Sequence, residues 1–121
     1  MSSVNSVPIE NKPLEEINAY ADKVNGEKDA KSQRYEAAKT QMSVWQRAKT
    51  AAHTKYMTLK SNSKTTKSYE LNHALADYNT TCNSYRDAEI NEDISRDSYL
   101  GSIFYAGKIN NQAIIANHAS A

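Results

Sequence analysis

The fold is decided by residues 14–59, which read LEEINAYADKVNGEKDAKSQRYEAAKTQMSVWQRAKTAAHTKYMTL. Stepping alternately by three and four residues meets an apolar side chain at nearly every step, and only three lysines interrupt the series. This spacing places the apolar side chains on one stripe of an α-helix, as in a coiled coil. It predicts one helix that begins at Pro13, whose ring suits a first helical turn, and ends near residue 60. The stripe consists of Leu14, Ile17, Ala21, Val24, Lys28, Lys31, Tyr35, Ala38, Met42, Trp45, Lys49, Ala52, Tyr56 and Leu59.

The stripe stops after Leu59, because the next positions in the same phase are all polar. Residues 61–65 read SNSKT, and such side chains compete for backbone hydrogen bonds and weaken a helix. One continuous helix remains an alternative, because the stretch contains no glycine. We expect the chain to turn here instead, since a second apolar stripe starts one residue out of phase. That stripe consists of Leu71, Leu75, Tyr78, Cys82 and Tyr85.

The predicted fold class is all-α, a long antiparallel two-helix hairpin of the coiled-coil type that is completed by oligomerisation or by a partner. We expect residues 1–12 to form a flexible N-terminal arm, 13–116 to form the hairpin and 117–121 to form a frayed tail. The predicted parts of the hairpin are a first helix at about 13–60, a turn at about 61–66 and a second helix at about 67–116.

A turn near residue 63 also predicts which positions of the two helices face each other. Lys49, one of the three lysines in the first stripe, falls opposite Asp77. The basic residues within 28–39 fall opposite the acidic residues within 87–97. Opposed charges contribute little stability one by one, but they help to set orientation and register.

Composition excludes several classes of protein. The 121 residues include three glycines and two prolines, which is too few for the frequent turns of a sheet protein. The 15 basic and 14 acidic side chains leave a net charge of +1, so the chain has no general attraction to nucleic acid. No apolar run is long enough to span a membrane, and the N-terminus lacks the apolar stretch of a secretory signal. We expect a chain that is cytoplasmic, or exported without a cleaved signal peptide.

The sequence contains no strong catalytic or phosphate-binding motif, and a two-helix chain offers little concave surface for a site. We therefore expect no enzyme activity, no cofactor and no small-molecule substrate. His53, His73 and Asp77 fall near one level of the predicted hairpin and could supply three zinc ligands, but a fourth ligand is missing. The favoured interpretation is that both histidines face solvent without a metal. Cys82 lies on the second stripe, where a free thiol behaves as a small buried apolar side chain.

The length and the predicted hairpin are similar to those of WXG-type secreted proteins, whose Trp-x-Gly lies in the turn between two helices. Here Trp45-Gln46-Arg47 lies within the first helix and lacks the glycine, so the sequence departs from that family. Needle and filament subunits of bacterial injection systems are also short helical hairpins, a likeness that rests on shape alone.

The C-terminal part of the second helix differs from the rest, because its apolar residues lie around the helix and not on one stripe. A single neighbouring helix covers one face, so the other faces need a further partner. We predict a partner-binding site here, for a second copy of the chain or for another helical protein. The predicted site residues are Leu100, Ile103, Phe104, Ile109 and Ile114.

The expected function is that of a non-enzymatic structural or assembly subunit that acts through helix–helix contacts. Such a chain self-associates or packs in a larger complex, for example as a secretion-system, filament or virion component. A two-helix chain of this size buries little apolar surface, and oligomerisation is the common remedy. The alternative is a small regulatory binding module that docks on another protein and inhibits or tethers it.

Overall fold

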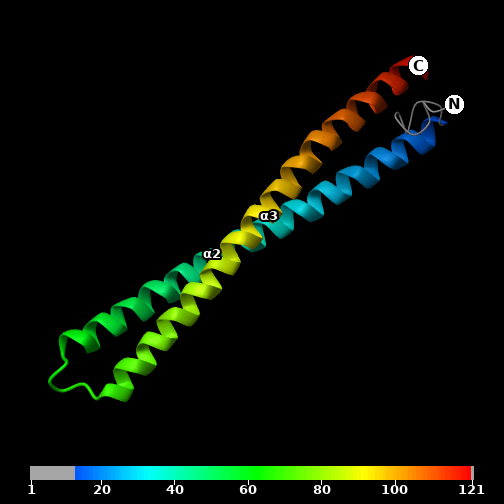
Figure 1. The fold of residues 1–121 in the computed structure, drawn as a ribbon. Coiled ribbons are helices and arrows are strands. Elements are labelled where there is room, and N and C mark those ends of the chain that lie inside the picture. The colour runs from blue at the N-terminus through cyan, green and yellow to red at the C-terminus, as the bar shows by residue number, and fades with distance from the viewer. Residues whose placement is uncertain (1–12, 121) are drawn as a thin grey trace. The chain divides into compact units, whose positions relative to one another are not determined.

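The chain folds as a helical hairpin in the computed structural model, which describes residues 13–120 (Figure 1). Helix α2 (Leu14–Ser61) and helix α3 (Ser68–Ser120) pack against each other in opposite directions. These described residues contain no strand. The predicted all-α antiparallel hairpin is therefore confirmed, and the alternative of one continuous helix is wrong. The predicted arm, residues 1–12, lies outside the described residues.

The start of α2 follows from local hydrogen bonding. The Pro13 carbonyl accepts the backbone N–H of Ile17 at 3.0 Å, so Pro13 lies just before the first helical residue and not within the first turn. Glu15 and Glu16 occupy that first turn, where the positive end of the helix dipole stabilises negative charge.

The connection between the helices, residues 62–67, turns without a glycine. The Asn62 carbonyl accepts the backbone N–H groups of Thr65 and Thr66, both at 3.0 Å. The Thr65 hydroxyl donates to the same carbonyl at 3.1 Å. No described residue has a positive φ, so the turn needs none of glycine's conformational freedom.

The C-terminal end of α3 differs from the prediction. The sequence predicts a frayed tail at 117–121, whereas the helix continues through Ser120. Asn117 supplies the physical reason, because its Nδ2 donates to the Ala113 carbonyl at 2.7 Å and to Asn18 Oδ1 on α2 at 2.8 Å. The hydrogen bond to α2 stabilises the last turns of α3.

The hairpin divides into two compact units, each built from both helices. The described part of unit 1 comprises residues 13–34 and 96–120, and unit 2 comprises residues 35–95. Unit 1 holds a small apolar core against which Tyr20 and Ala116 pack. Its members are Ile17, Ala21, Val24, Ala106, Ile109 and Ala113.

Unit 2 has a thinner core. Its fully buried residues are three alanines, Ala38, Ala74 and Ala88, together with the carboxylate residue Glu92. Larger side chains such as Trp45 and Tyr85 are only half-buried. Small side chains along a seam let two helices approach closely, but they remove little apolar area from water.

Burial confirms the α2 stripe and all but one position of the α3 stripe. Every predicted α2 position from Leu14 to Leu59 is buried or half-buried. On α3 the predicted Leu71, Tyr78, Cys82 and Tyr85 are half-buried, whereas Leu75 is exposed and its neighbour Ala74 is buried instead. The reason is that a closely packed seam accepts the smaller side chain and leaves the leucine outside. Helical spacing alone does not distinguish these adjacent positions.

The pairing of the helices also differs from the predicted register. Lys49 Nζ lies 4.9 Å from the centre of the Tyr85 ring, and not opposite Asp77. Asp77 is engaged on its own helix, where its Oδ2 lies 3.4 Å from Nδ1 of His73. The helices end at Ser61 and start again at Ser68, so the turn is centred later than residue 63, which accounts for part of the shift. A later centre moves every facing position along α3.

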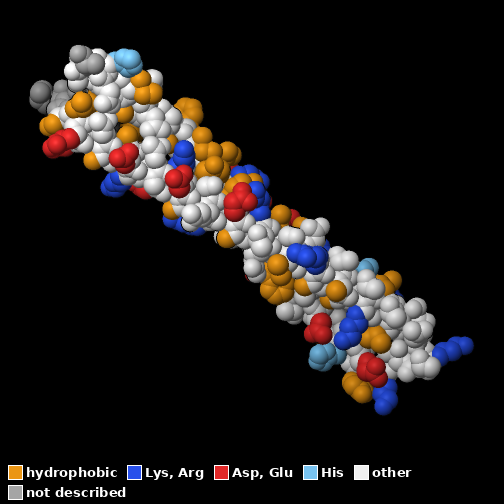
Figure 2. Space-filling model, turned by 180° about the vertical axis from the view of Figure 1, so that it is seen from behind, with side chains coloured by type: hydrophobic (Ala, Val, Ile, Leu, Met, Phe, Trp, Pro, Cys, Tyr) orange, Lys and Arg blue, Asp and Glu red, His pale blue; other side chains and the backbone are white. Residues whose placement is uncertain are grey.

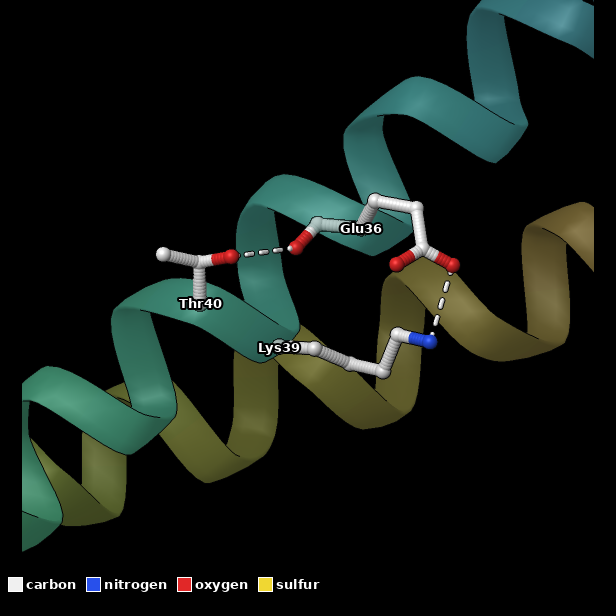
Figure 3. A network of polar contacts seen from close by, with 3 residues as sticks. All are labelled: Glu36, Lys39 and Thr40. Carbon is white, nitrogen blue, oxygen red and sulfur yellow. Dashed lines mark hydrogen bonds and ion pairs between the residues drawn. The ribbon is translucent and has the colours of Figure 1, made fainter.

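The predicted facing of basic residues on α2 and acidic residues on α3 is found in part, around Lys39. Lys39 forms an ion pair with Glu36 on its own helix at 2.8 Å, and Thr40 donates to the Glu36 carbonyl at 3.1 Å (Figure 3). The hydrogen bond that Lys39 donates to Glu36 is the main reason why the pKa of Lys39 is raised, and the negative charge of Glu92 on α3 adds least to this shift. Glu92 thus lies near enough to Lys39 for its charge to contribute, as the predicted facing of the two charged stretches requires.

Candidate interaction surface

The residues considered as zinc ligands are not brought together. His73 lies beside Asp77, whereas the His53 ring packs against Tyr78 with ring centroids 5.2 Å apart. Within residues 13–120 no three His, Cys, Asp or Glu side chains lie close enough to hold a metal ion. Neither α2 nor α3 contains a stretch long and apolar enough to cross a lipid bilayer.

Cys82 belongs to the packing of unit 2. The thiol is half-buried, and the Tyr78 hydroxyl hydrogen-bonds with it. This hydrogen bond is the main cause that raises the pKa of Tyr78. The sequence places Cys82 on the apolar stripe of α3, and its half-buried position agrees with that placement.

The most prominent surface feature of unit 1 is an apolar patch on α3, which we call the outer face. Figure 2 shows apolar side chains at the surface of the half of the molecule that holds the start of α2 and the end of α3. Phe104 is the most exposed, at 79% of its surface. The outer face consists of the exposed residues Leu100, Ile103, Phe104, Ile114 and Ile115.

Four of the five predicted site residues lie on this face, and the fifth does not. Ile109 is only 1% exposed and belongs to the core of unit 1, so its assignment to a partner site is wrong. Its position on α3, three residues from Ala106 and four from Ala113, continues the buried seam toward α2. Ile115, which the predicted site omitted, is exposed and takes its place.

The outer face is also poor in charge. Between residues 98 and 117 the only ionisable acid or base among Asp, Glu, Lys and Arg is Lys108. The apolar area that the five side chains present is on the order of 500 Å², since a phenylalanine alone offers about 150–250 Å². A patch of this size lies at the upper end of what monomeric proteins expose, and charge depletion is typical of interface centres.

Two pairs of asparagines border the core of unit 1 on one side of the seam. Asn25 and Asn110 exchange two hydrogen bonds of 2.9 and 3.0 Å through their side-chain amides. One heptad away, Asn18 and Asn117 form the same reciprocal pair, with distances of 3.4 and 2.8 Å. These pairs fix which residues of α2 and α3 face each other. The signal available in the sequence was that the two asparagines on each helix, Asn18 and Asn25 on α2 and Asn110 and Asn117 on α3, are seven residues apart.

The opposite side of the seam carries a tyrosine pair. The hydroxyl oxygens of Tyr20 and Tyr105 lie 2.6 Å apart and share a hydrogen bond. This hydrogen bond is the main cause that raises the pKa of Tyr105. Beside the pair lies a groove of about 330 Å³, and Gly101 is the residue without a side chain in its α3 wall. The groove is lined by Tyr20, Val24, Glu27, Lys31, Asp97, Ser98, Gly101, Ser102 and Tyr105.

Two glycines stand within α3 beside the outer face, and the hairpin itself does not require them. A Cβ atom at Gly101 or Gly107 would meet no other atom within 4 Å, and neither residue has a positive φ. Glycine in a helix interior costs about 1 kcal/mol relative to alanine. Phe104 lies between them, three residues from each. The space at these positions is therefore open to the outside.

No protein-family model matches the chain, and no curated protein or solved structure matches it either. The functional argument therefore rests on the outer face, the groove and the glycines of unit 1.

Proposed function

We propose that the chain is a non-enzymatic structural or assembly subunit that works through helix–helix contacts made by the outer face of α3. The observation that carries this proposal is the exposure of Phe104 at the middle of an apolar, almost uncharged helical surface. Unit 1 buries only six residues of its own, three of them large aliphatics, so covering the outer face would add substantially to its apolar core.

The chemistry of the surface supports binding of another helix more than binding of a small molecule. Helix-in-groove contacts use apolar anchors spaced by three, four and seven residues. Ile103 and Phe104 lie three and four residues after Leu100, and Ile114 lies two heptads after Leu100 on the same side of α3. A helical chain that offers a matching stripe would cover them, as in the bundles that structural subunits form.

The test is association measured by analytical ultracentrifugation and by capture from the source cell extract, for the wild type and for Phe104→Ala. Truncating a central aromatic anchor costs about 2 kcal/mol or more of binding, which weakens the complex at least about 30-fold. Lys64→Ala in the turn is the matched control and should change nothing. Equal association of the wild type and Phe104→Ala would refute the proposal. A monomeric wild type that captures one partner through Phe104 would instead place the chain among regulatory binding modules.

A further inference from the structure

We propose that the outer face of α3 binds a second copy of this chain across a two-fold axis, with the α3 helices antiparallel and each Phe104 ring seated at Gly101 of the other copy. This inference rests on the proposed function and names its partner. It stands on three features of unit 1: a protruding ring, a hollow beside it, and two opposite charges, Asp97 and Lys108, that lie one heptad from the ring and from the hollow respectively.

The ring and the hollow belong to the same surface of the same helix. Phe104 protrudes with 79% of its surface exposed. Gly101 lies three residues earlier and lines the groove of about 330 Å³, next to Ser98 and Ser102. A volume of about 150 Å³ accommodates a benzene ring, so the open groove has room for one phenyl side chain, which would lie against Val24 and Gly101 with Glu27, Lys31 and Asp97 at the edge of the ring. A surface that carries both a projection and a matching hollow is self-complementary, as a two-fold interface requires.

Charge selects the antiparallel arrangement. When Phe104 of one helix lies level with Gly101 of an antiparallel copy, Asp97 lies level with Lys108 of that copy. The reason is that Asp97 lies seven residues before Phe104 and Lys108 lies seven residues after Gly101. Lys108 is the one charged residue between 98 and 117, and Asp97 is the last acid before it. The two-fold axis makes each of these contacts twice. A parallel arrangement would place Asp97 beside Asp97 and Phe104 beside Phe104, which loses both matches.

The area agrees with a specific dimer. Two outer faces of on the order of 500 Å² each remove on the order of 1,000 Å² from water, the size at which specific protein interfaces begin. The dimer also explains why residue 101 is a glycine. A side chain at this position would fill the hollow, although a Cβ there meets no atom of its own chain within 4 Å. The intrachain fold leaves the position free for any residue, and the second copy restricts it to glycine.

The experiment compares Gly101→Leu with the control Gly26→Leu by sedimentation equilibrium of the full chain. Both glycines are helical, and a Cβ at either one meets nothing within 4 Å, so both variants should keep or raise helix content. We expect Gly101→Leu to raise the dimer dissociation constant at least about 10-fold, as expected when an anchor loses its seat, and Gly26→Leu to leave it unchanged. Circular dichroism checks that each variant is folded.

A charge reversal provides the second arm. Asp97→Lys alone and Lys108→Asp alone should each weaken the dimer at low salt, and the double variant should restore it, because it recreates both pairs with exchanged signs. The inference is overturned if the wild type stays monomeric at all concentrations, or if Gly101→Leu associates like Gly26→Leu. If Phe104→Ala still abolishes binding of some partner in that case, the proposed function stands and only the second copy is wrong. If Phe104→Ala has no effect either, both proposals fail.

Discussion

Replacing Ile109 with alanine should destabilise the fold strongly, while the same change at Ile114 should not. Ile109 is 1% exposed in the core of unit 1, whereas Ile114 lies on the outer face of the same helix. Removing a buried isoleucine to alanine costs about 2–5 kcal/mol, with the larger values where the cavity cannot collapse. The α3 neighbours of Ile109 in the core are Ala106 and Ala113, which have no side-chain length to fill a void. We therefore expect about 3–4 kcal/mol for Ile109→Ala.

In a chain of this size such a loss lowers the melting temperature by about 10–20 °C, since each kcal/mol corresponds to about 3–6 °C. Urea unfolding followed by circular dichroism gives the free energy directly. The measurement uses a protein concentration at which the wild type is monomeric, because self-association would add stability by mass action. Ile114→Ala should remain within about 0.5 kcal/mol of the wild type, as is usual for exposed positions. Equal losses for Ile109→Ala and Ile114→Ala would show that the assignment of inner and outer positions on α3 is wrong.

Two further predictions concern the polar pairs of unit 1. Asn25→Ala and Asn110→Ala should each lower the free energy of unfolding in urea by about 1–2 kcal/mol. The double variant should lose less than the sum of the two, because the same reciprocal pair is lost only once. Additive losses would contradict a direct pair. The hydrogen bond with Tyr20 raises the pKa of Tyr105 above its usual 10.0 in the folded state, so its stabilising contribution is present below about pH 10 and is lost as the pH rises through the raised value. Unfolding followed from pH 8 to 11 should therefore show an alkaline loss of stability that Tyr105→Phe reduces, and an unchanged pH profile in that variant would contradict it.

The hairpin and the α2 stripe could be predicted because they follow from local rules. Spacing of three and four residues from Leu14 to Leu59 specifies one helix with one buried side, whatever it packs against. The turn followed from the side chains of Ser61 to Thr65, which compete with the helical hydrogen bonds. Both signals lie within a few residues along the chain, so no knowledge of the partner helix is needed to interpret them.

On α3 the same rules placed Leu71, Tyr78, Cys82 and Tyr85, which are half-buried, but they missed the buried Ala74 and the inner position of Ile109. At Ala74 and Leu75 the sequence favours the larger side chain as the buried one, but the distance between two packed helices decides in favour of alanine. Ile109 resembles Ile114 in side-chain type, and its place three residues after Ala106 and four before Ala113 puts it on the buried side of α3. Register depends on contacts between residues 85 to 99 positions apart, such as Tyr20 with Tyr105 and Asn18 with Asn117, and these become visible only in the folded chain.

The two asparagine pairs bear on how the hairpin avoids slippage. A seam that repeats every seven residues and carries many alanines and serines offers similar contacts when one helix slides along the other by a full repeat. In a chain displaced by one repeat, Asn25 could still meet Asn117, or Asn18 could meet Asn110, but the other two amides would be left without each other. Only the native alignment gives all four side-chain amides a hydrogen-bond partner. The amides thus distinguish the native alignment from its nearest competitors, in a seam where apolar contacts alone would leave neighbouring alignments close in free energy.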